Sequence, residues 1–365
     1  MKNVTMISRR SFLKAAMAAS AVSALAFTGC GGSASSTVAA SSTASSAAAS
    51  AAAEGGQTFK VGIVNYVDHA SLNQIVESVE SRLDELGAEK GVTFDYADYY
   101  ANAQADQSNL NQIGADLVGD GVDVIVAVAT PTAATMLAAV EDTDIPVVYS
   151  AVTDPAAAGF DGEENITGTS DALNTEAIMN LITAVNPDID TIGLLYDLSQ
   201  DASTQAIADA KAFCDANGIK YIEKNGTTTA EVQMAAEALI ASGVKAVFTP
   251  TDNTVMTAEL SIYETFTEAG VQHYTGADSF ALNGAFVGYG VDYVQLGEAT
   301  ADMVAELLCD GKTTADLPYQ TFDNGIVTIN TETCEALGLD LDTVKEAFKH
   351  YCTEIVEVTT AENFS

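Results

Sequence analysis

The chain has 365 residues and a formal net charge of −37 at pH 7, with 51 acidic side chains against 14 Lys and Arg. This balance excludes proteins that bind the phosphate backbone of nucleic acids, because too few cations are present to replace the condensed counterions. We interpret the acidity itself as a property that keeps an exposed surface soluble.

The first 29 residues are typical of an export signal. They contain no Asp or Glu, and four basic residues lie ahead of or at the start of the apolar stretch 15–27. This stretch is shorter than the roughly 20 residues of a membrane-spanning helix, which favours a cleaved signal peptide. Arg9-Arg10, followed by Phe12-Leu13-Lys14, resembles a twin-arginine signal, and export by the Sec route remains the alternative.

The segment Phe27-Thr28-Gly29-Cys30 resembles a bacterial lipobox, in which the cysteine receives a diacylglycerol after cleavage. Residues 31–57 are almost entirely Ala, Ser, Thr and Gly, a composition that buries too little apolar surface to become ordered. We therefore expect a signal peptide over residues 1–29 and a disordered tether over residues 30–57. Lipid on Cys30 would hold the protein on the extracytoplasmic face of the cell membrane. The alternative is a secretory protein in which Cys30 is incidental.

From Thr58 onward, short β-branched runs alternate with amphipathic helical patterns, as in parallel sheets covered on both faces. The first series predicts strands at Phe59–Asn65, Val92–Ala97, Val122–Ala129 and Pro146–Ser150, with helices at Ser71–Glu89, Ala105–Gly119 and Thr132–Glu141. The second predicts strands at Thr191–Tyr196, Lys220–Lys224, Ala246–Thr249 and His273–Thr275, with helices at Ser203–Asn217, Glu231–Ser242 and Thr257–Ala269. Left-handed caps are expected at the glycines that follow five of these helical patterns: Gly87, Gly119, Gly218, Gly243 and Gly270.

The two series resemble each other, because a buried strand runs into Thr-Pro-Thr in both, at Thr130–Thr132 and at Thr249–Thr251. Internal duplication explains this better than chance. We expect an α/β fold of two doubly wound parallel-sheet lobes joined by crossing strands. Residues 58–169 plus about 279–310 would form lobe 1, and residues 170–278 plus about 311–365 would form lobe 2.

Ligands of open parallel sheets bind beyond the carboxyl ends of the strands, and the loops expected there are polar. The candidate ligand-binding residues in these loops are Tyr66, Thr130, Thr132, Ala133, Thr153, Asp154, Ser170, Asp171, Tyr196, Asp252, Asn253, Asp278 and Phe280. Arg82 is the one arginine beyond the signal, and it lies on a helical pattern whose other face is apolar. A ligand carboxylate would therefore be held by backbone amides and hydroxyl groups instead of an arginine.

The helix expected to begin at Thr130–Ala134 offers such an anion site. Its first amides have no partner inside the helix, and the helix dipole favours negative charge there. Independently of any ligand, Thr130 is expected to cap this helix. Asp252 and Asp278 are candidates to bind an ammonium group, with helix capping as the alternative for Asp252. Tyr66, Tyr196 and Phe280 could pack on an apolar ligand side chain or belong to the ordinary core.

Several of these segments together resemble the ABC-transporter substrate-binding family that includes the tryptophan- and tyrosine-binding lipoproteins. The segments are Val61–His69, Ala129–Pro131, Ser150–Pro155, Thr167–Asp171, Pro250–Val255 and Gly290–Tyr293, and the resemblance covers Phe59–Leu339. It implies a type I periplasmic-binding-protein fold, import of a small solute, and a permease and an ATPase as partners. An aromatic amino acid is the ligand it favours. Ala70-Ser71 departs from the family, which usually has a proline after the position of His69.

No pattern of catalytic residues, cofactor-binding glycines or metal ligands is evident, so we expect a monomeric binding protein without catalytic activity, cofactor or metal. The four cysteines beyond Cys30 have no zinc-type spacing, and Cys334 and Cys352 could pair or remain free thiols. Two other functions stay open at this point. One is an exported α/β enzyme acting on a small metabolite in the same cleft. The other is a ligand sensor for a membrane kinase.

Overall fold

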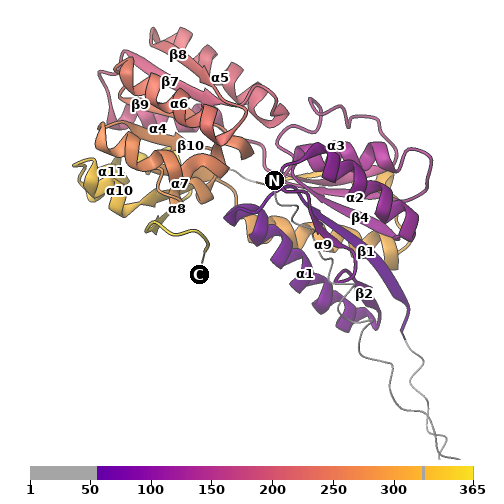
Figure 1. Cartoon of the computed structure of the whole chain (residues 1–365). Coiled ribbons are helices and arrows are strands. Elements are labelled where there is room, and N and C mark those ends of the chain that lie inside the picture. The colour runs from indigo at the N-terminus through magenta and orange to yellow at the C-terminus, as the bar shows by residue number, and fades with distance from the viewer. Residues whose placement is uncertain (1–55, 323–324, 365) are drawn as a thin grey trace, which may run out of the picture. The chain divides into compact units, whose positions relative to one another are not determined.

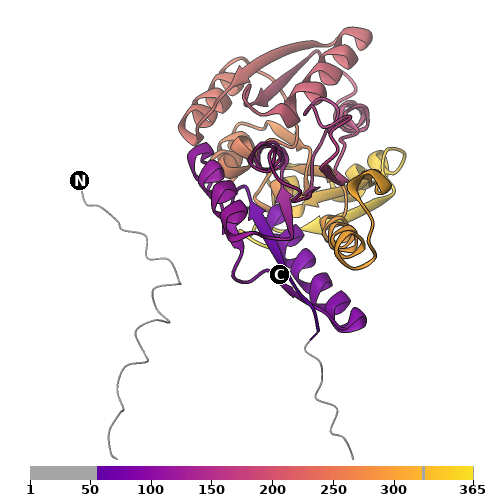
Figure 2. The same ribbon diagram turned by 90° about the vertical axis from the view of Figure 1, so that its right-hand side faces the viewer.

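The computed structural model describes residues 56–322 and 325–364 of the chain. The expected signal peptide, the lipid site at Cys30 and all but the last two residues of the expected tether lie outside these residues. The described part forms two predominantly parallel sheets flanked by helices, which confirms the predicted α/β fold class (Figure 1 and Figure 2). Within it, no helix combines the length and apolar character needed to cross a membrane.

The first sheet has seven strands in the order β12-β6-β5-β4-β1-β2, with β3 also paired to β1, and all its pairings are parallel. Its strands are β1 (Thr58–Asn65), β2 (Thr93–Asp95), β3 (Tyr100–Asn102), β4 (Val124–Val128), β5 (Val147–Ser150), β6 (Ile166–Ser170) and β12 (Gln320–Thr321). The accompanying helices are α1 (Ala70–Lys90), α2 (Gln107–Asp120), α3 (Thr130–Ala139) and α9 (Tyr293–Cys309). Every residue of β4 is buried, as expected for a central strand with both faces covered.

The second sheet also has seven strands, in the order β14-β13-β11-β10-β9-β7-β8, and its one antiparallel pair is β11 with β13. Its strands are β7 (Thr191–Tyr196), β8 (Lys220–Asn225), β9 (Ala246–Thr249), β10 (Gln272–Thr275), β11 (Val287–Gly290), β13 (Ile326–Asn330) and β14 (Glu354–Val358). The accompanying helices are α4 (Thr175–Val185), α5 (Asp201–Asn217), α6 (Thr229–Ala241), α7 (Asn253–Glu268), α8 (Asp278–Leu282), α10 (Thr331–Ala336) and α11 (Leu341–Phe348). Outside both sheets, Thr314–Asp316 form a short 3-10 helix.

The chain passes between the sheets three times: after β6, between β11 and α9, and between β12 and β13. Two of the expected lobe borders are therefore wrong. The stretch from residue 279 to β11 belongs with the second sheet, and β12 belongs with the first. The reason is hydrogen bonding between strands distant in sequence: β11 pairs with β10 and β13, and β12 pairs with β6.

Helix α9 returns to the first sheet and lies beside α1, where Figure 1 shows it in orange next to the indigo helix. A buried cluster of hydroxyl groups fixes its position. The Thr300 Oγ1 on α9 lies 2.9 Å from Ser150 Oγ and 2.9 Å from Thr169 Oγ1, at the ends of β5 and β6. On the outer side, Arg82 of α1 donates to Asp302 of α9 at 2.9 Å.

Two of the predicted glycine caps are wrong, although the predicted helix ends at Glu89 and Gly119 lie within one residue of the observed ones. Helix α1 continues past Gly87 to a left-handed cap at Gly91, and α2 continues past Gly119 to a left-handed cap at Gly121. Gly218, Gly243 and Gly270 have the expected positive φ after α5, α6 and α7. The four cysteines of the described part, Cys214, Cys309, Cys334 and Cys352, are free thiols.

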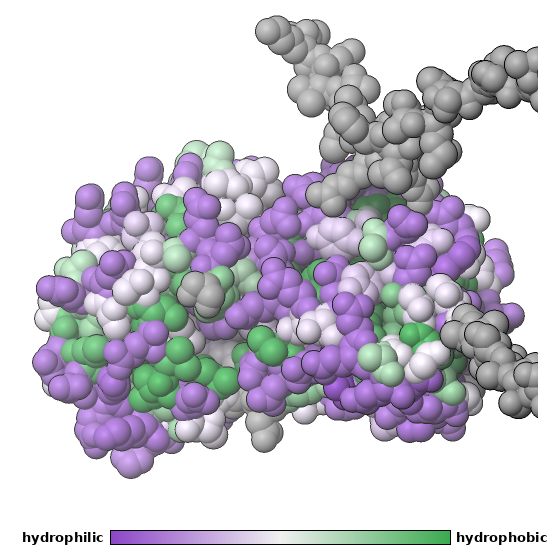
Figure 3. Space-filling model, turned by 90° about the horizontal axis from the view of Figure 1, so that it is seen from below, coloured by the Kyte–Doolittle hydropathy of each residue, from purple (hydrophilic) through white to green (hydrophobic). Residues whose placement is uncertain are grey.

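The molecular surface reflects the acidic composition. The face drawn in Figure 3 is largely hydrophilic, with smaller apolar patches between the polar residues. Large apolar side chains that are exposed are scattered over different elements, among them Leu198, Met234 and Leu260. Single exposed apolar residues are normal on a protein surface and indicate no particular partner.

The contact between α1 and α9 gives a first prediction. A Cβ at Gly297 would lie 2.7 Å from the Ile75 carbonyl oxygen and 2.8 Å from the Ser78 Cβ. We expect Gly297→Ala to lower the free energy of unfolding by roughly 1–3 kcal/mol, because α9 must move away from α1. Urea unfolding measures the effect. Gly119→Ala is the matched control, since a Cβ there has no neighbour within 4 Å, and it should be neutral or slightly stabilising. Equal effects of the two substitutions would contradict this account of the packing.

Candidate functional site

The carboxyl ends of strands from both sheets border one pocket, which has an empty volume of about 400 Å³ when the adjoining open solvent is included. The segments that follow strands of the first sheet, together with α9, contribute His69, Ser71, Leu72, Ala129, Thr130, Ala151, Thr153, Asp171 and Tyr293. The segments around strands of the second sheet contribute Ala202, Thr251, Asp252, Asn253, Met256, Ala277, Ser279 and Phe280.

The pocket brings together six of the residues predicted to bind ligand, which are Thr130, Thr153, Asp171, Asp252, Asn253 and Phe280. The predicted residues that do not line it are Tyr66, Thr132, Ala133, Asp154, Ser170, Tyr196 and Asp278. Most of the pocket residues that were not predicted lie in the same loops or directly beside them. Ser71 and Leu72 instead lie in the first turn of α1, and Tyr293 begins α9 after a long return of the chain.

Thr130 lies at the first helical position of α3, and the prediction that it caps this helix is wrong. The N-cap is Ala129, which has φ 77° and no side chain able to accept a hydrogen bond. The helix begins one residue earlier than a threonine cap would require. In the described structure, the Thr130 hydroxyl is buried without a hydrogen-bond partner, although Thr130 lines the pocket. Buried hydroxyls are normally paired, so this group is available to a ligand.

The start of α3 has the free amides of a helix N-terminus, but fewer than the sequence suggested. The Ala133 amide donates to the Ala129 carbonyl at 3.0 Å, so it is used inside the helix, and Pro131 has no N–H. The amides that remain without a partner inside the helix are those of Thr130 and Thr132, which come before its first hydrogen bond. The Thr132 hydroxyl is also buried without a partner in the described residues, beside rather than on the pocket wall.

Asp252 is the N-cap of α7, and its carboxylate is fully used by the protein. Oδ1 accepts from the amides of Thr254 and Val255, both at 3.0 Å. Oδ2 accepts from the Asp197 amide and the Ser203 hydroxyl, both at 2.7 Å. Burial raises the pKa of Asp252 to about 6, against the effect of these hydrogen bonds. Of the two roles considered for Asp252, the geometry favours capping over contact with an ammonium group.

Asp171 follows β6 and is the pocket carboxyl group with unused acceptor capacity. It is 5 % exposed, and its Oδ1 accepts from the Thr153 hydroxyl at 3.0 Å. The Tyr293 hydroxyl lies 3.4 Å from Oδ2. Burial raises the pKa of Asp171 above its ordinary value, and the hydrogen bonds from Thr153 and Tyr293 oppose that shift. A carboxylate with two oxygens can accept further hydrogen bonds from a cationic ligand group.

Four other predicted residues have roles away from the pocket wall. Asp278 begins α8 and accepts from the Ser71 hydroxyl at 2.9 Å, and burial raises its pKa to about 6. Tyr196 belongs to the apolar core of the second sheet, and its hydroxyl donates to Glu223 at 2.7 Å. Asp154 and Ser170 line a neighbouring cavity. For Tyr196, ordinary core packing is therefore the role that the structure supports.

His69 connects segments that follow strands of different sheets. Its Nδ1 accepts from the Leu72 amide as the cap of α1, at 3.5 Å, so in the neutral ring Nε2 carries the proton. Nε2 lies 3.0 Å from Asn253 Oδ1 and donates to it. Burial lowers the pKa of His69 to about 4, which keeps the ring neutral at physiological pH. This histidine was not among the residues predicted to bind ligand.

The backbone is strained at two positions of the pocket wall. Ala129 and Ala151 have φ of 77° and 57°, conformations that are unfavourable for a residue with a Cβ. They follow β4 and β5 directly. Such strain persists only where the surrounding structure enforces it, and it concentrates at functional sites. In the described residues, no group of three or more His, Cys, Asp or Glu side chains could hold a metal ion.

Comparison with protein families gives a match to the family described as ABC transporter substrate binding protein, over residues 60–355. Among curated proteins, the tyrosine-binding protein of Clostridioides difficile (strain R20291) is 28% identical over 286 residues. That alignment covers 76% of this chain and 81% of the relative. This is a family of binding proteins rather than enzymes, in agreement with the prediction of a protein without catalytic activity.

Solved structures give the same result. An ABC domain from Streptococcus pneumoniae in complex with L-Trp is 28% identical, with a TM-score of 0.73, over 82% of this chain and 100% of that one. A conserved domain protein from Vibrio cholerae is 30% identical, with a TM-score of 0.71 over the same shares. A ligand-free, open substrate-binding protein from Clostridium difficile is 28% identical, with a TM-score of 0.62, over 83% of this chain and 100% of that one.

The capping role of Asp252 gives a second prediction. Asp252→Ala should lower the free energy of unfolding by roughly 2–4 kcal/mol, because four donors lose a buried carboxylate. Asp106→Ala is the control. Asp106 caps α2 through one bond, from the exposed Asn109 amide, and its loss should cost about 1 kcal/mol. Chemical denaturation of both variants measures the difference. A similar small cost for both would contradict the assignment of Asp252 as a buried multiple cap.

Proposed function

This chain belongs to the family of ABC transporter substrate binding proteins, and we propose that it binds a free amino acid, most favourably an aromatic one. The ligand would lie in a cleft between two lobes and would be delivered to the permease of an ABC importer. The observation that carries the proposal is the pocket itself, which is lined by polar and apolar side chains from the segments around both sheets. Similarity to the tyrosine-binding protein and to the L-Trp complex supports the choice of ligand class.

The α-carboxylate of the ligand would bind at the start of α3. The unpaired Thr130 hydroxyl, the amides before the helical ladder and the helix dipole all favour an anion there. Arg82 supports this assignment, because it is engaged with Glu85 and Asp302 and does not line the pocket. The site would bind a carboxylate without a cationic side chain.

Asp171 would bind the α-ammonium group, and the side chain of the ligand would lie against Leu72, Met256 and Phe280. Asp171 is buried in the pocket wall and is positioned by the Thr153 hydroxyl. A charge-assisted hydrogen bond to a buried carboxylate is among the stronger polar contacts in a protein. The apolar residues come from α1, α7 and α8, so an aromatic ring would be enclosed by groups from both sheets.

Ligand would act by favouring a closed arrangement of the two lobes. Three hydrogen bonds join residues that follow strands of different sheets: His69 with Asn253 at 3.0 Å, Ser71 with Asp278 at 2.9 Å, and Thr153 with Thr251 at 3.1 Å. The TM-score is higher against the L-Trp complex than against the ligand-free, open protein, at 0.73 and 0.62. A ligand that touches both lobes shifts the population toward this arrangement by its higher affinity for it.

Export and lipid anchoring complete the proposal. The arginine pair, the apolar segment, Cys30 and the Ala/Ser-rich stretch that follows support a lipoprotein on the extracytoplasmic side of the membrane. A receptor in this place could release its ligand directly to a membrane permease. We propose that it acts as a monomer at the end of its tether.

Ligand titration tests the proposed function. The chain has no tryptophan, so the change in fluorescence of added L-tryptophan, excited where tyrosine does not absorb, reports its binding without a tryptophan signal from the protein. We expect saturable binding of L-tryptophan, its displacement by L-tyrosine, and weaker displacement by glycine. Thermal unfolding measured with each amino acid extends the panel. A protein that responds to none of the twenty amino acids would refute the ligand class.

The anion site is tested in the same titration. Thr130→Val removes one hydroxyl from the pocket wall with little change in shape, and we expect roughly a tenfold loss of affinity. Because the Thr130 hydroxyl has no hydrogen-bond partner among the described residues, the substitution should not lower the melting temperature. Unchanged affinity would place the carboxylate elsewhere.

Asp171 gives a prediction with a definite pH dependence. In the free protein its pKa lies above the ordinary value of 3.8, and a bound ammonium group would lower it. Affinity should therefore rise with pH over the acidic range in which the carboxyl group ionises, and the rise should end above the ordinary pKa of 3.8, because the pKa in the free protein is raised. Asp171→Asn should weaken binding by roughly 10- to 100-fold and remove most of this dependence.

Asp278→Asn is the matched control, because Asp278 also has a raised pKa but does not line the pocket. The asparagine can still accept from Ser71. Calorimetric titration of both variants over this pH range separates the two acids. If Asp278→Asn loses affinity and Asp171→Asn does not, the ammonium group binds at Asp278.

A further inference from the structure

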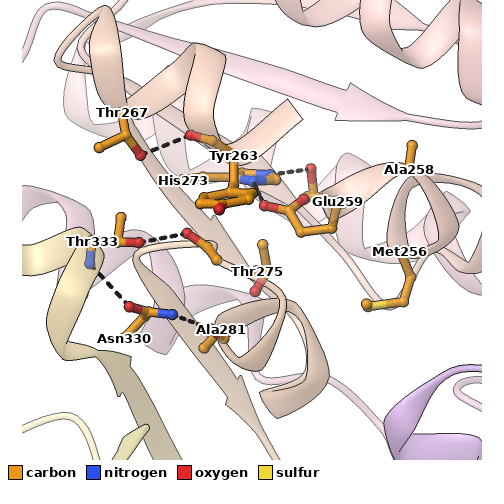
Figure 4. Close-up of polar contacts among 12 residues, drawn as sticks. Met256, Ala258, Glu259, Tyr263, Thr267, His273, Thr275, Ala281, Asn330 and Thr333 are labelled. Carbon is orange, nitrogen blue, oxygen red and sulfur yellow. Dashed lines mark hydrogen bonds and ion pairs between the residues drawn. The ribbon is translucent and has the colours of Figure 1, made fainter. Parts of the chain in front are cut away.

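Directly behind the pocket, the second sheet contains a buried chain of three polar side chains. The ring of His273, on β10, lies between Glu259 of α7 and Thr249 of β9. Figure 4 shows the contact between His273 and Glu259. The His273 Nδ1 is 3.0 Å from Glu259 Oε1, and its Nε2 is 2.8 Å from Thr249 Oγ1. His273 is 2% exposed, and both partners are 0% exposed.

The order of these groups is hydroxyl, imidazole, carboxylate, as in enzymes that activate a nucleophile. Here the hydroxyl cannot meet a substrate, because Thr249 is fully buried at the end of a strand that pairs with β10 on one side. Both ring nitrogens of His273 are engaged, Nδ1 with the Glu259 carboxyl group and Nε2 with the Thr249 hydroxyl. These two contacts fix the orientation of the ring.

This arrangement is costly for the fold. Glu259 Oε2 is buried and, within the described structure, has no hydrogen-bond partner. Removing a carboxylate from water costs several kcal/mol, and apolar side chains of similar volume often serve a core equally well. Glu259, His273 and Thr249 thus contribute less to the stability of the core than an apolar cluster could. This indicates a role other than stabilising the fold.

Each of the three residues is adjacent to the pocket wall. The ring of His273 contacts Phe280 edge to face, with 6.3 Å between centroids, and Phe280 lines the pocket. Thr249 is followed by the turn that carries Thr251 and Asp252 into the pocket. Glu259 lies one turn of α7 beyond Met256, another pocket residue.

We propose that Glu259, His273 and Thr249 are positioning residues for the bound ligand. Their hydrogen bonds hold the Phe280 ring and the β9–α7 turn in the shape that encloses the ligand side chain. None of the three touches the ligand. The proposal rests on the proposed function of the pocket as an amino-acid site, and it assigns the shape of the second-sheet wall to these groups.

The experiment compares three substitutions, of which Thr249→Val and Tyr274→Phe nearly preserve side-chain volume and Thr249→Ser removes one methyl group. Thr249→Val removes the hydroxyl and leaves His273 Nε2 without its partner, whereas Thr249→Ser keeps the hydroxyl. Tyr274→Phe is the control for stability. Tyr274 follows His273 on β10 and belongs to the core cluster that excludes Phe280, and its buried hydroxyl donates to Gln272 at 2.7 Å.

L-Tryptophan and L-tyrosine are the probes, with melting temperatures measured in parallel. We expect Thr249→Val to raise the dissociation constant at least fivefold. Thr249→Ser and Tyr274→Phe should remain within twofold of the parent protein, although Tyr274→Phe lowers the melting temperature as Thr249→Val does. Unchanged affinity in Thr249→Val, or an equal loss in Tyr274→Phe, overturns the proposal.

A measurement without ligand keeps this inference separate from the proposed function. With 4-fluorophenylalanine in place of Phe280, the ¹⁹F resonance reports the position of that ring. It should shift or broaden in Thr249→Val and stay in place in Thr249→Ser and Tyr274→Phe. If the parent protein binds neither amino acid but the resonance behaves in this way, the ligand class fails and the positioning role stands. An identical resonance in all variants overturns the positioning role.

Discussion

Parallel pairing is the constraint on which the rest of the molecule depends. Every pairing in the first sheet is parallel, so the carboxyl ends of neighbouring strands reach the same edge. The central strands of the second sheet, β7, β9, β10 and β11, do the same. Residues as distant in sequence as His69, Asp171 and Phe280 meet in one pocket because each follows such a strand end.

The chemistry of the pocket follows from a shortage of cations. Arg82 forms ion pairs with Glu85 and Asp302 on the outer side of α1 and α9. The polar groups available in the pocket are therefore hydroxyl groups, amides and carboxylates. Two of the carboxyl groups have different tasks. Asp252 organises the second-sheet wall through four accepted hydrogen bonds, and Asp171 keeps the acceptor capacity that a cationic group could use. Two residues of the same type are thus distinguished by their hydrogen-bond partners alone.

The sequence predicts the strands and helices of both series well, because hydrophobic periodicity is a local property. It also predicts the loops that form the pocket, since strand order within a βα series decides where they lie. The errors concern contacts between distant segments. Tyr196 belongs to the core and not to the pocket, and its hydroxyl donates to Glu223 of the neighbouring strand β8. Similarly, β12 belongs to the first sheet because it pairs with β6. Neither contact leaves a local pattern.

Helix starts were the second source of error. Ala129 has a positive φ that no sequence rule for alanine suggests, so α3 begins one residue before a threonine cap would allow. The consequence reaches the pocket, because a capping Thr130 would have its hydroxyl satisfied by the helix. His69 was not among the predicted pocket residues, because its role arises from Asn253, which begins α7 beside the second sheet.

The three passages of the chain between the sheets have a consequence for how the protein can be made. The first sheet is completed by α9 and β12, which are synthesised after β7 to β11 of the second sheet. Neither lobe is therefore encoded by one continuous stretch, and no single truncation yields one lobe intact. During synthesis, the first sheet remains incomplete until Thr321 has been made and the second until Val358, so neither lobe can be completed before most of the other has been synthesised.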